Sequence, residues 1–144
     1  MKNLGYISAG TIIPLWVIMK KKVVIAIFET DPLNRFIYQK MLEPQRDRVS
    51  FHIFNSAEEG LGKAAELACD VAFIDMHMHG KFFGGLDIVK KLKMISDQTT
   101  MIAMTTLIQD GDVERATSGG FFKCTEKPLP FFDLDKLLVG IIDI

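Results

Sequence analysis

The sequence has little of several features that mark particular protein classes. It contains two cysteines, Cys69 and Cys124, among 144 residues, which excludes a disulfide framework and fits a reducing compartment. Its 17 basic and 18 acidic residues leave a formal charge of −1, so the chain has no large net charge that would hold nucleic acid nonspecifically. Neither of the common glycine-rich phosphate loops occurs, so a nucleotide site is not supported. What the chain does have is 49% hydrophobic residues, which excludes a disordered chain, and a length that suits one domain.

The N-terminal segment, residues 1–21, differs in composition from the rest of the chain. Residues 3–19 carry no charge and are followed by three consecutive lysines, residues 20–22. Seventeen residues interrupted by Pro14 are at the short edge of a membrane-spanning helix. One interpretation is therefore a weak membrane anchor, with the lysines keeping the following domain on the cytoplasmic side.

Simpler interpretations of this apolar segment also stay open. Translation that begins at Met19 would leave most of it out of the protein, and residues 12–18 would alternatively dock on the domain as an arm or an added strand. Under each interpretation the domain itself is expected to span residues 22–144.

From residue 22 onward, short apolar runs alternate with longer amphipathic ones. Runs rich in Val, Ile and Phe predict strands, and apolar residues three or four apart predict helices. Asp31 followed by Pro32 is a helix start signal, and so is Ser56 with Glu59. The strands are expected at residues 23–28, 48–54, 70–74, 100–104 and 121–125, and the helices at 32–42, 57–68, 86–95, 112–117 and 130–142.

Five strands that alternate with five helices predict a doubly wound α/β domain with a parallel sheet. In such a sheet, ligands bind in the crevice outside the carboxyl ends of the strands. The polar residues that follow the expected strands are therefore the candidates for a site: Glu29, Thr30, Asp31, Asp75, Thr105, Thr106 and Lys127.

Four of these candidates suit the chemistry of phosphoryl transfer. A carboxylate nucleophile needs a nearby cation to offset charge, and a hard divalent ion prefers oxygen ligands. A lysine and a hydroxyl group can hold the phosphoryl oxygens. Asp75, Glu29, Lys127 and Thr105 provide this set of groups.

Four segments around these residues resemble the response-regulator receiver domain. The family's first strand and acidic corner are similar to VVIAIFETDPLNR, its phosphoacceptor strand to VAFIDMHMHG, its hydroxyl-bearing strand to MIAMTT, and its Lys-Pro corner to EKP. The intervals are also close to those of receivers: 46 residues from Glu29 to Asp75, 30 from Asp75 to Thr105 and 22 from Thr105 to Lys127. The resemblance covers residues 22 to about 138 and implies a flavodoxin-like (βα)5 fold with strand order 2-1-3-4-5.

The resemblance also implies a role in a two-component system or phosphorelay. Asp75 would accept a phosphoryl group from a phosphohistidine on a histidine kinase or phosphotransfer protein, Lys127 would pair with it, and Thr105 would follow the new phosphoryl oxygens. Mg2+ would be held by Glu29, Asp75 and the main-chain carbonyl of His77. Phosphorylation would then change a surface that binds a downstream protein or a second copy of the chain. The domain is thus expected to be a cytoplasmic phosphoacceptor rather than an enzyme.

Several positions depart from the family pattern. Thr30 stands where receivers carry a second acid, so Mg2+ is expected to bind weakly. Asp31 is a poor substitute for that acid because its place before a proline suits a helix cap. Cys124 stands where receivers place an aromatic switch residue, and we expect it to be a buried and inert thiol. His79 replaces a proline that is usual in the acceptor loop.

Two other segments differ in length from the family. The loop over residues 80–85 is about two residues longer than is typical, and residues 129–132 resemble a small insertion before the last helix. Phe82 and Phe83 in the long loop either contact a partner or fold back onto the core.

These departures favour one alternative function and leave room for another. Thr30 and Cys124 suit a pseudo-receiver, a scaffold whose partner surface works without phosphorylation. A hydrolytic or zinc enzyme that uses Asp75 with His77 and His79 is a weaker hypothesis, because a softer third ligand is missing.

Overall fold

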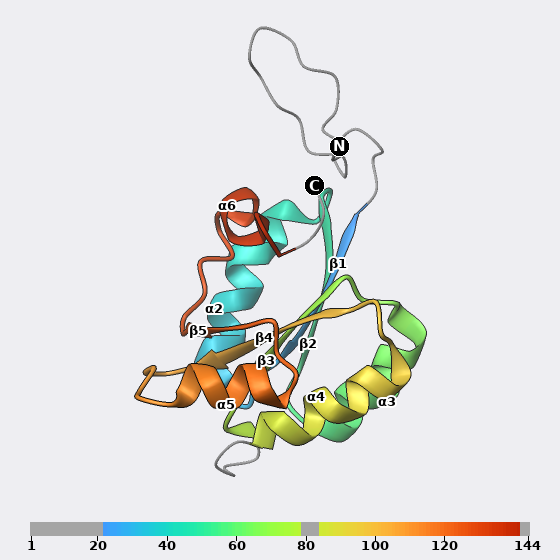
Figure 1. Ribbon diagram of the computed structural model, residues 1–144. Coiled ribbons are helices and arrows are strands. Elements are labelled where there is room, and N and C mark those ends of the chain that lie inside the picture. The colour runs from blue at the N-terminus through green and yellow to red at the C-terminus, as the bar shows by residue number, and fades with distance from the viewer. Residues whose placement is uncertain (1–21, 79–83, 142–144) are drawn as a thin grey trace, which may run out of the picture.

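The computed structural model describes residues 22–78 and 84–141 of the chain. Five parallel strands form one sheet in the order β2-β1-β3-β4-β5, and helices connect successive strands (Figure 1). This is the flavodoxin-like topology, so the expected fold class and strand order are confirmed. In the described part of the chain no helix is both long and apolar enough to cross a membrane.

The three central strands coincide with apolar runs of the sequence, whereas the two edge strands contain polar residues. The middle strand β3 is buried at every position, as expected for a parallel sheet that is covered on both faces. Its neighbours align with it in register, so that Phe28 pairs with Ile74 on one side and Asp75 pairs with Met104 on the other. The strands are β1 (Val23–Phe28), β2 (Val49–Phe54), β3 (Val71–Asp75), β4 (Thr100–Thr105) and β5 (Lys123–Glu126).

The helices begin at the signals that the sequence carries. Asp31 caps α2 by accepting a hydrogen bond from the Leu33 N–H at 2.9 Å, and Ser56 caps α3 by accepting one from the Glu59 N–H at 3.2 Å. The helical elements are α2 (Pro32–Leu42), the 3-10 turn η1 (Glu43–Gln45), α3 (Ala57–Leu67), α4 (Gly84–Ile95), α5 (Asp112–Gly119) and α6 (Leu134–Leu138).

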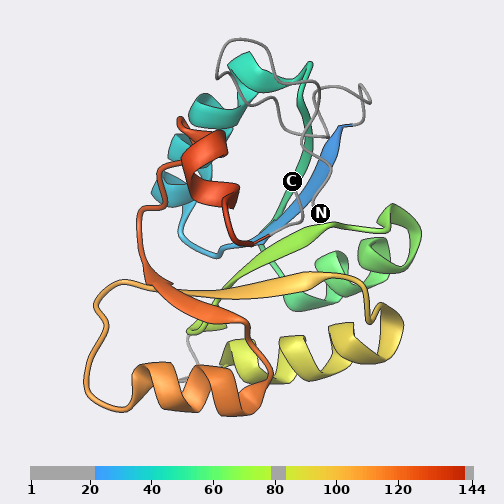
Figure 2. The ribbon, with the colours of Figure 1, turned by 45° about the horizontal axis from the view of Figure 1, so that its top comes forward.

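The helices form two layers around the sheet. Helices α2 and α6 cover one face, and α3, α4 and α5 cover the other (Figure 2). Alternate residues of a strand contact different helix layers, because successive side chains of a strand point to opposite faces. Ile25 and Ile27 pack under α2 and α6, whereas Ala26 and Phe28 pack under the other three helices.

The end of the chain differs from the expectation that a helix begins at Pro130. Leu129 and Phe131 are both fully buried, and Phe131 packs edge-on against Tyr38 at a ring separation of 4.9 Å. Residues 129–133 form a turn instead of a helix: the N–H of Phe131 donates to the Leu129 carbonyl at 2.9 Å, and the N–H of Asp133 donates to the Pro130 carbonyl at 3.0 Å. The helix therefore begins after the Asp133 cap and runs over Leu134–Leu138, and the expected start at Pro130 was wrong.

Smaller differences concern element ends. Strand β5 begins and ends later than expected, at Lys123 and Glu126, and α5 continues to Gly119. Several predictions concern residues outside the described part: the apolar segment 1–21, His79, Phe82 and Phe83, and the end of the last helix at residue 142.

Candidate functional site

The candidate residues come from four strands that end at the same edge of the sheet. Glu29 follows β1, Asp75 is the last residue of β3, Thr105 is the last residue of β4, and Lys127 follows β5. The order β1-β3-β4-β5 makes these strands consecutive neighbours. A hydrogen bond of 2.7 Å from the Lys127 N–H to the Thr105 carbonyl ties the last two strand ends together. Residues that lie up to 98 positions apart in the sequence therefore meet in one site.

Lys127 is shared between two carboxylates. Its Nζ lies 3.0 Å and 3.1 Å from the two carboxylate oxygens of Glu29, and 3.1 Å from Oδ2 of Asp75. The exposed fraction of the side chain is 8% for Lys127, 0% for Glu29 and 5% for Asp75. Two buried negative charges thus share one buried positive charge, which leaves the cluster with a net charge of −1.

Burial and charge act in opposite directions on the pKa values of this cluster. Burial alone lowers the pKa of Lys127, but attraction to Asp75 and Glu29 outweighs it and the net shift is upward. Burial raises the pKa of Glu29 above its ordinary value, against the opposing effects of the Asp31 N–H and Lys127. Lys127 therefore stays charged at neutral pH. When the pH falls, it is a carboxylate of the cluster that takes up a proton.

The remaining oxygen of Asp75 is held by the backbone that follows it. Oδ1 accepts a hydrogen bond of 2.9 Å from the His77 N–H. The next turn is fixed by a bond from the Gly85 N–H to the Met76 carbonyl at 2.9 Å. A Cβ on Gly85 would lie 2.7 Å from the Asp75 carbonyl oxygen, so only glycine lets α4 start this close to the acceptor strand.

The acidic corner contains a cation that the sequence analysis did not identify. Arg35, on the first turn of α2, donates from Nη1 to the main-chain carbonyls of Thr30 at 2.5 Å and Glu29 at 3.2 Å. The guanidinium group thus holds the loop that carries Thr30. The sequence did carry one signal for this contact. Arg35 lies four residues after the Asp31 cap, so both residues belong to the same helix start. Asp31 itself is exposed and occupied as the cap, as expected.

The hydroxyl and thiol positions differ in burial. Thr105 is buried at the site edge, whereas Thr106 is exposed and does not belong to the site.

Cys124 is half-buried, and its Sγ lies 4.0 Å from Sδ of Met76, the residue after Asp75. Burial, and to a lesser degree Asp112, raises the pKa of the Cys124 thiol, so it stays protonated at neutral pH, as expected of an inert thiol.

The residues suit a hard cation better than a soft one. Within residues 22–78 and 84–141, no group of three or more His, Cys, Asp or Glu side chains is placed to hold a metal, so the zinc hypothesis has no support there. The corner does present oxygen atoms, those of the Glu29 and Asp75 carboxylates. Oxygen ligands and a surplus negative charge fit Mg2+, and the missing second acid reduces that fit.

Solved structures with the same fold are receiver domains and response regulators. The signal receiver domain of the DNA-binding response regulator merR from Colwellia psychrerythraea 34H matches with a TM-score of 0.70 and 25% identity, over 83% of this chain and 97% of that chain. A response regulator protein from Burkholderia pseudomallei matches with a TM-score of 0.68 and 14% identity, over 83% and 66%. A chain of the Saccharomyces cerevisiae complex between Ypd1 and the Ssk1 receiver domain matches with a TM-score of 0.66 and 18% identity, over 83% and 86%.

The sequence itself carries the family signal. No curated protein matches the chain. A family model described as the response regulator receiver domain matches residues 25–139, which include Glu29, Asp75, Thr105 and Lys127. With the fold of two-component phosphoacceptors and four strand ends in the expected places, the chain belongs to the response regulator receiver domain family.

Proposed function

We propose that the chain accepts a phosphoryl group on Asp75 in a two-component or phosphorelay pathway. The observation that carries the proposal is the buried ammonium group of Lys127, which contacts Asp75 and Glu29 at 3.0–3.1 Å. A structural salt bridge needs one carboxylate for each ammonium group. A surplus carboxylate that is buried beside a cation, at the end of a strand, is instead suited to act as a nucleophile.

The reaction follows from these positions. An oxygen of Asp75 bonds to the phosphorus of a phosphohistidine as the P–N bond breaks, and the electron pair of that bond stays with the imidazole of the donor. Lys127 offsets the charge that develops on the phosphoryl oxygens, because it already lies 3.1 Å from the carboxylate. Thr105 at the adjacent strand end offers a hydroxyl group to the same oxygens. The phosphorylated side chain carries a charge of about −1.5 to −2, in place of the charge of −1 of the free carboxylate.

Mg2+ would be held by the carboxylates of Glu29 and Asp75, the main-chain carbonyl of His77 and the Thr30 hydroxyl. When bound, it supplies positive charge that favours a phosphoryl group beside two carboxylates. Thr30 contributes a neutral oxygen where an acid would contribute a charge, so we expect weak affinity.

Two similar structures support this proposal by what their titles describe. The Burkholderia pseudomallei response regulator was solved with a phosphorylated aspartic acid and a calcium ion. The Ssk1 receiver domain was solved with the histidine phosphotransfer protein Ypd1. By analogy, the phosphoryl donor of this chain is a histidine kinase or a phosphotransfer protein, and the output is a protein that distinguishes the two states of Asp75.

Labelling with a small phosphodonor tests the proposal. Incubation with acetyl phosphate and Mg2+ is expected to add one phosphoryl mass to the intact protein. Asp75→Asn is expected to lose this label, whereas Asp87→Asn, an exposed carboxylate on α4, should keep it. Label on both variants would mean that another residue is modified.

A second candidate is a pseudo-receiver that binds its partner without phosphorylation. The observation that favours it is the acidic corner, where Thr30 replaces an acid and its carbonyl is held by Arg35 at 2.5 Å. Cys124, in place of an aromatic residue, also removes the usual moving ring. An unlabelled wild-type protein at high Mg2+ concentration would support this candidate and contradict phosphoacceptance.

A further inference from the structure

Helix α2 carries an apolar groove on its outer side, away from the phosphoacceptor site. Phe36 and Phe132 line the groove with exposed fractions of 58% and 70%, which is unusual for large aromatic residues. Lys40 lies over the Phe36 ring at 5.4 Å and is the charged residue of the lining. The groove measures about 560 Å³, and Phe36, Ile37, Met41, Pro44, Gln45 and Phe132 form most of its wall.

The groove ends close to the point where the chain enters the domain. Gln45, in the groove wall, donates from Nε2 to the carbonyls of Met41 at 2.9 Å and Phe131 at 2.7 Å, which joins α2 to the segment before α6. Three residues later, the Arg48 carbonyl accepts a hydrogen bond of 3.1 Å from the N–H of Val23, the first residue of β1. The start of β1 therefore lies beside the turn that forms one end of the groove.

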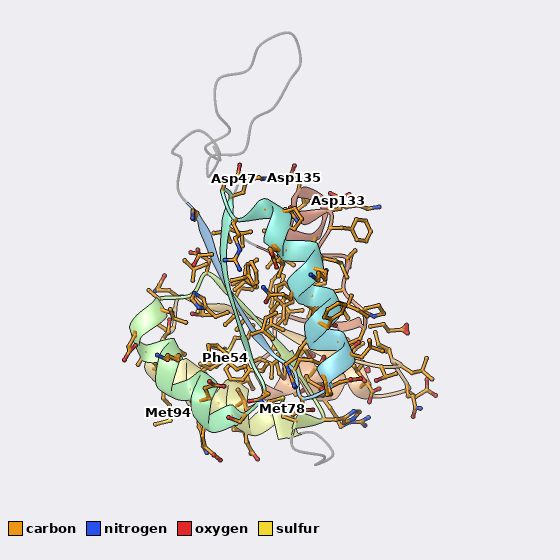
Figure 3. The ribbon with its side chains drawn as sticks, turned by 180° about the vertical axis from the view of Figure 1, so that it is seen from behind. Asp47, Phe54, Met78, Met94, Asp133 and Asp135 are labelled. Atoms are coloured by element: carbon orange, nitrogen blue, oxygen red, sulfur yellow. The ribbon has the colours of Figure 1, made fainter. Side chains whose placement is uncertain are left out.

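Charged side chains of both signs lie at this same end of the domain, because exposed Arg46 and Lys136 are next to Asp47 and Asp135 in the sequence. Figure 3 shows Asp47, Asp133 and Asp135 around the turn before β2 and the start of α6. Asp47 and Asp133 are exposed, and Asp135 forms an ion pair with Arg48.

We propose that the apolar segment of residues 12–18 packs in the α2 groove of its own domain. The sequence of the segment, IIPLWVI, is uncharged and matches the apolar lining. Five Cα steps separate residue 18 from Val23 and reach up to about 18 Å, more than the diameter of about 10–12 Å of a helix. The proposal concerns residues outside the described part and does not depend on phosphorylation of Asp75.

The covalent link favours this occupant over a second molecule. A short linker gives the segment an effective concentration on the order of millimolar at the groove, far above the concentration of a free partner. The same arrangement hides an apolar segment that would otherwise aggregate or bind lipid. A second copy of the chain and a lipid surface are the competing occupants, and the experiment separates them.

The single tryptophan of the chain, Trp16, lies in the proposed segment and reports on it directly. In the full-length protein we expect its emission to lie at short wavelength and to resist quenching by acrylamide. The double variant Phe36→Ser and Phe132→Ser removes two exposed rings of the groove without adding charge. It is expected to shift the Trp16 emission to longer wavelength and to raise the quenching constant several-fold.

A matched control replaces an equally exposed apolar residue elsewhere. Met94 lies on α4, has an exposed fraction of 87% and is far from Asp47, Asp133 and Asp135 (Figure 3). Met94→Ser should leave the emission and the quenching of Trp16 unchanged. A nuclear Overhauser contact between the Trp16 indole and the side chains of Ile37 or Met41 would support the proposal independently of any variant.

Three outcomes would overturn the proposal. If acrylamide quenches Trp16 fully in the wild-type protein, the segment has no docking site in the domain. Shielding that disappears on dilution, together with a dimer in sedimentation, assigns the groove to a second copy. Shielding that develops on addition of anionic phospholipid vesicles and is absent without them assigns the segment to a membrane surface.

Discussion

Replacement of Lys127 by methionine, which keeps the length of the side chain, is expected to destabilise the domain strongly. At an effective dielectric constant of about 20, the contacts of Lys127 Nζ with Glu29 at 3.0 Å and Asp75 at 3.1 Å are each worth about 5 kcal/mol of attraction. The variant loses both contacts and leaves two carboxylates within about 6 Å of each other without a cation. Water entry and proton uptake offset part of this loss, so we expect a cost of about 3–5 kcal/mol at neutral pH.

Removal of one carboxylate, in contrast, should not destabilise the domain. Asp75→Asn leaves Lys127 paired with Glu29 through both carboxylate oxygens, and it removes one buried charge and one repulsion. The lost attraction of about 5 kcal/mol is offset by these two terms, so the free energy of unfolding is expected to stay within about 1 kcal/mol of wild type or to rise. The comparison of the two variants tests whether the cluster carries surplus negative charge.

The cost of Lys127→Met is also expected to depend on pH. Without the ammonium group, Glu29 binds a proton more readily in the folded than in the unfolded chain, because burial already raises its pKa. A folded state that binds more protons gains stability as pH falls, so the variant should recover part of its loss between neutral pH and about pH 5. In the wild-type protein, the upward pKa shift of Lys127 stabilises the folded state below its unfolded pKa, and this contribution is lost as pH rises through the folded value.

Urea unfolding followed by far-ultraviolet circular dichroism at neutral pH and at about pH 5 measures these effects. Lys123→Met, an exposed lysine on β5, is the matched control and should change stability by no more than about 0.5 kcal/mol. The reasoning would be refuted if Lys127→Met cost the same at both pH values, or if Asp75→Asn cost as much as Lys127→Met.

Three further predictions concern the metal, an orphan hydroxyl and a close backbone approach. Thr30→Asp restores a charge at the acidic corner and should tighten Mg2+ binding by on the order of tenfold in calorimetric titration, whereas unchanged affinity would place residue 30 outside the cation site. The Tyr38 hydroxyl is buried without a hydrogen-bond partner in the described part of the chain, so Tyr38→Phe should raise the free energy of unfolding by about 1 kcal/mol. Gly85→Ala should cost about 1–3 kcal/mol and reduce labelling of Asp75, because the added Cβ would lie 2.7 Å from its carbonyl oxygen. Gly62→Ala meets no atom within 4 Å and should instead stabilise α3 by about 0.5–1 kcal/mol.

Local patterns were sufficient for most of the fold. Apolar and alternating runs predicted all five strands to within two residues at each end. The three central strands are apolar at nearly every position because both faces of the sheet are covered there. The Asp31-Pro32 start of α2 was predicted correctly for a similar reason. A cap needs a specific side chain at a specific position, so it leaves a signal in a few residues.

The last helix shows where local patterns fail. The sequence from residue 130 onward has helical spacing, but Leu129 and Phe131 are both buried and a hydrogen-bonded turn precedes the Asp133 cap. That choice depends on Tyr38 and Phe73, which receive the Phe131 ring from distant parts of the chain at ring separations of 4.9 Å and 5.0 Å. No window around residue 130 contains this information.

The same division holds for the site. The sequence alone was enough to name Glu29, Asp75, Thr105 and Lys127, because parallel strands that end at one sheet edge bring the residues after them together. Only the tertiary structure decided that Lys127 is shared between two carboxylates, and that Arg35 holds the Thr30 carbonyl. Which residues follow a strand is a property of the chain, whereas how charges are shared among them depends on distances of a few ångströms and on burial, which packing alone sets.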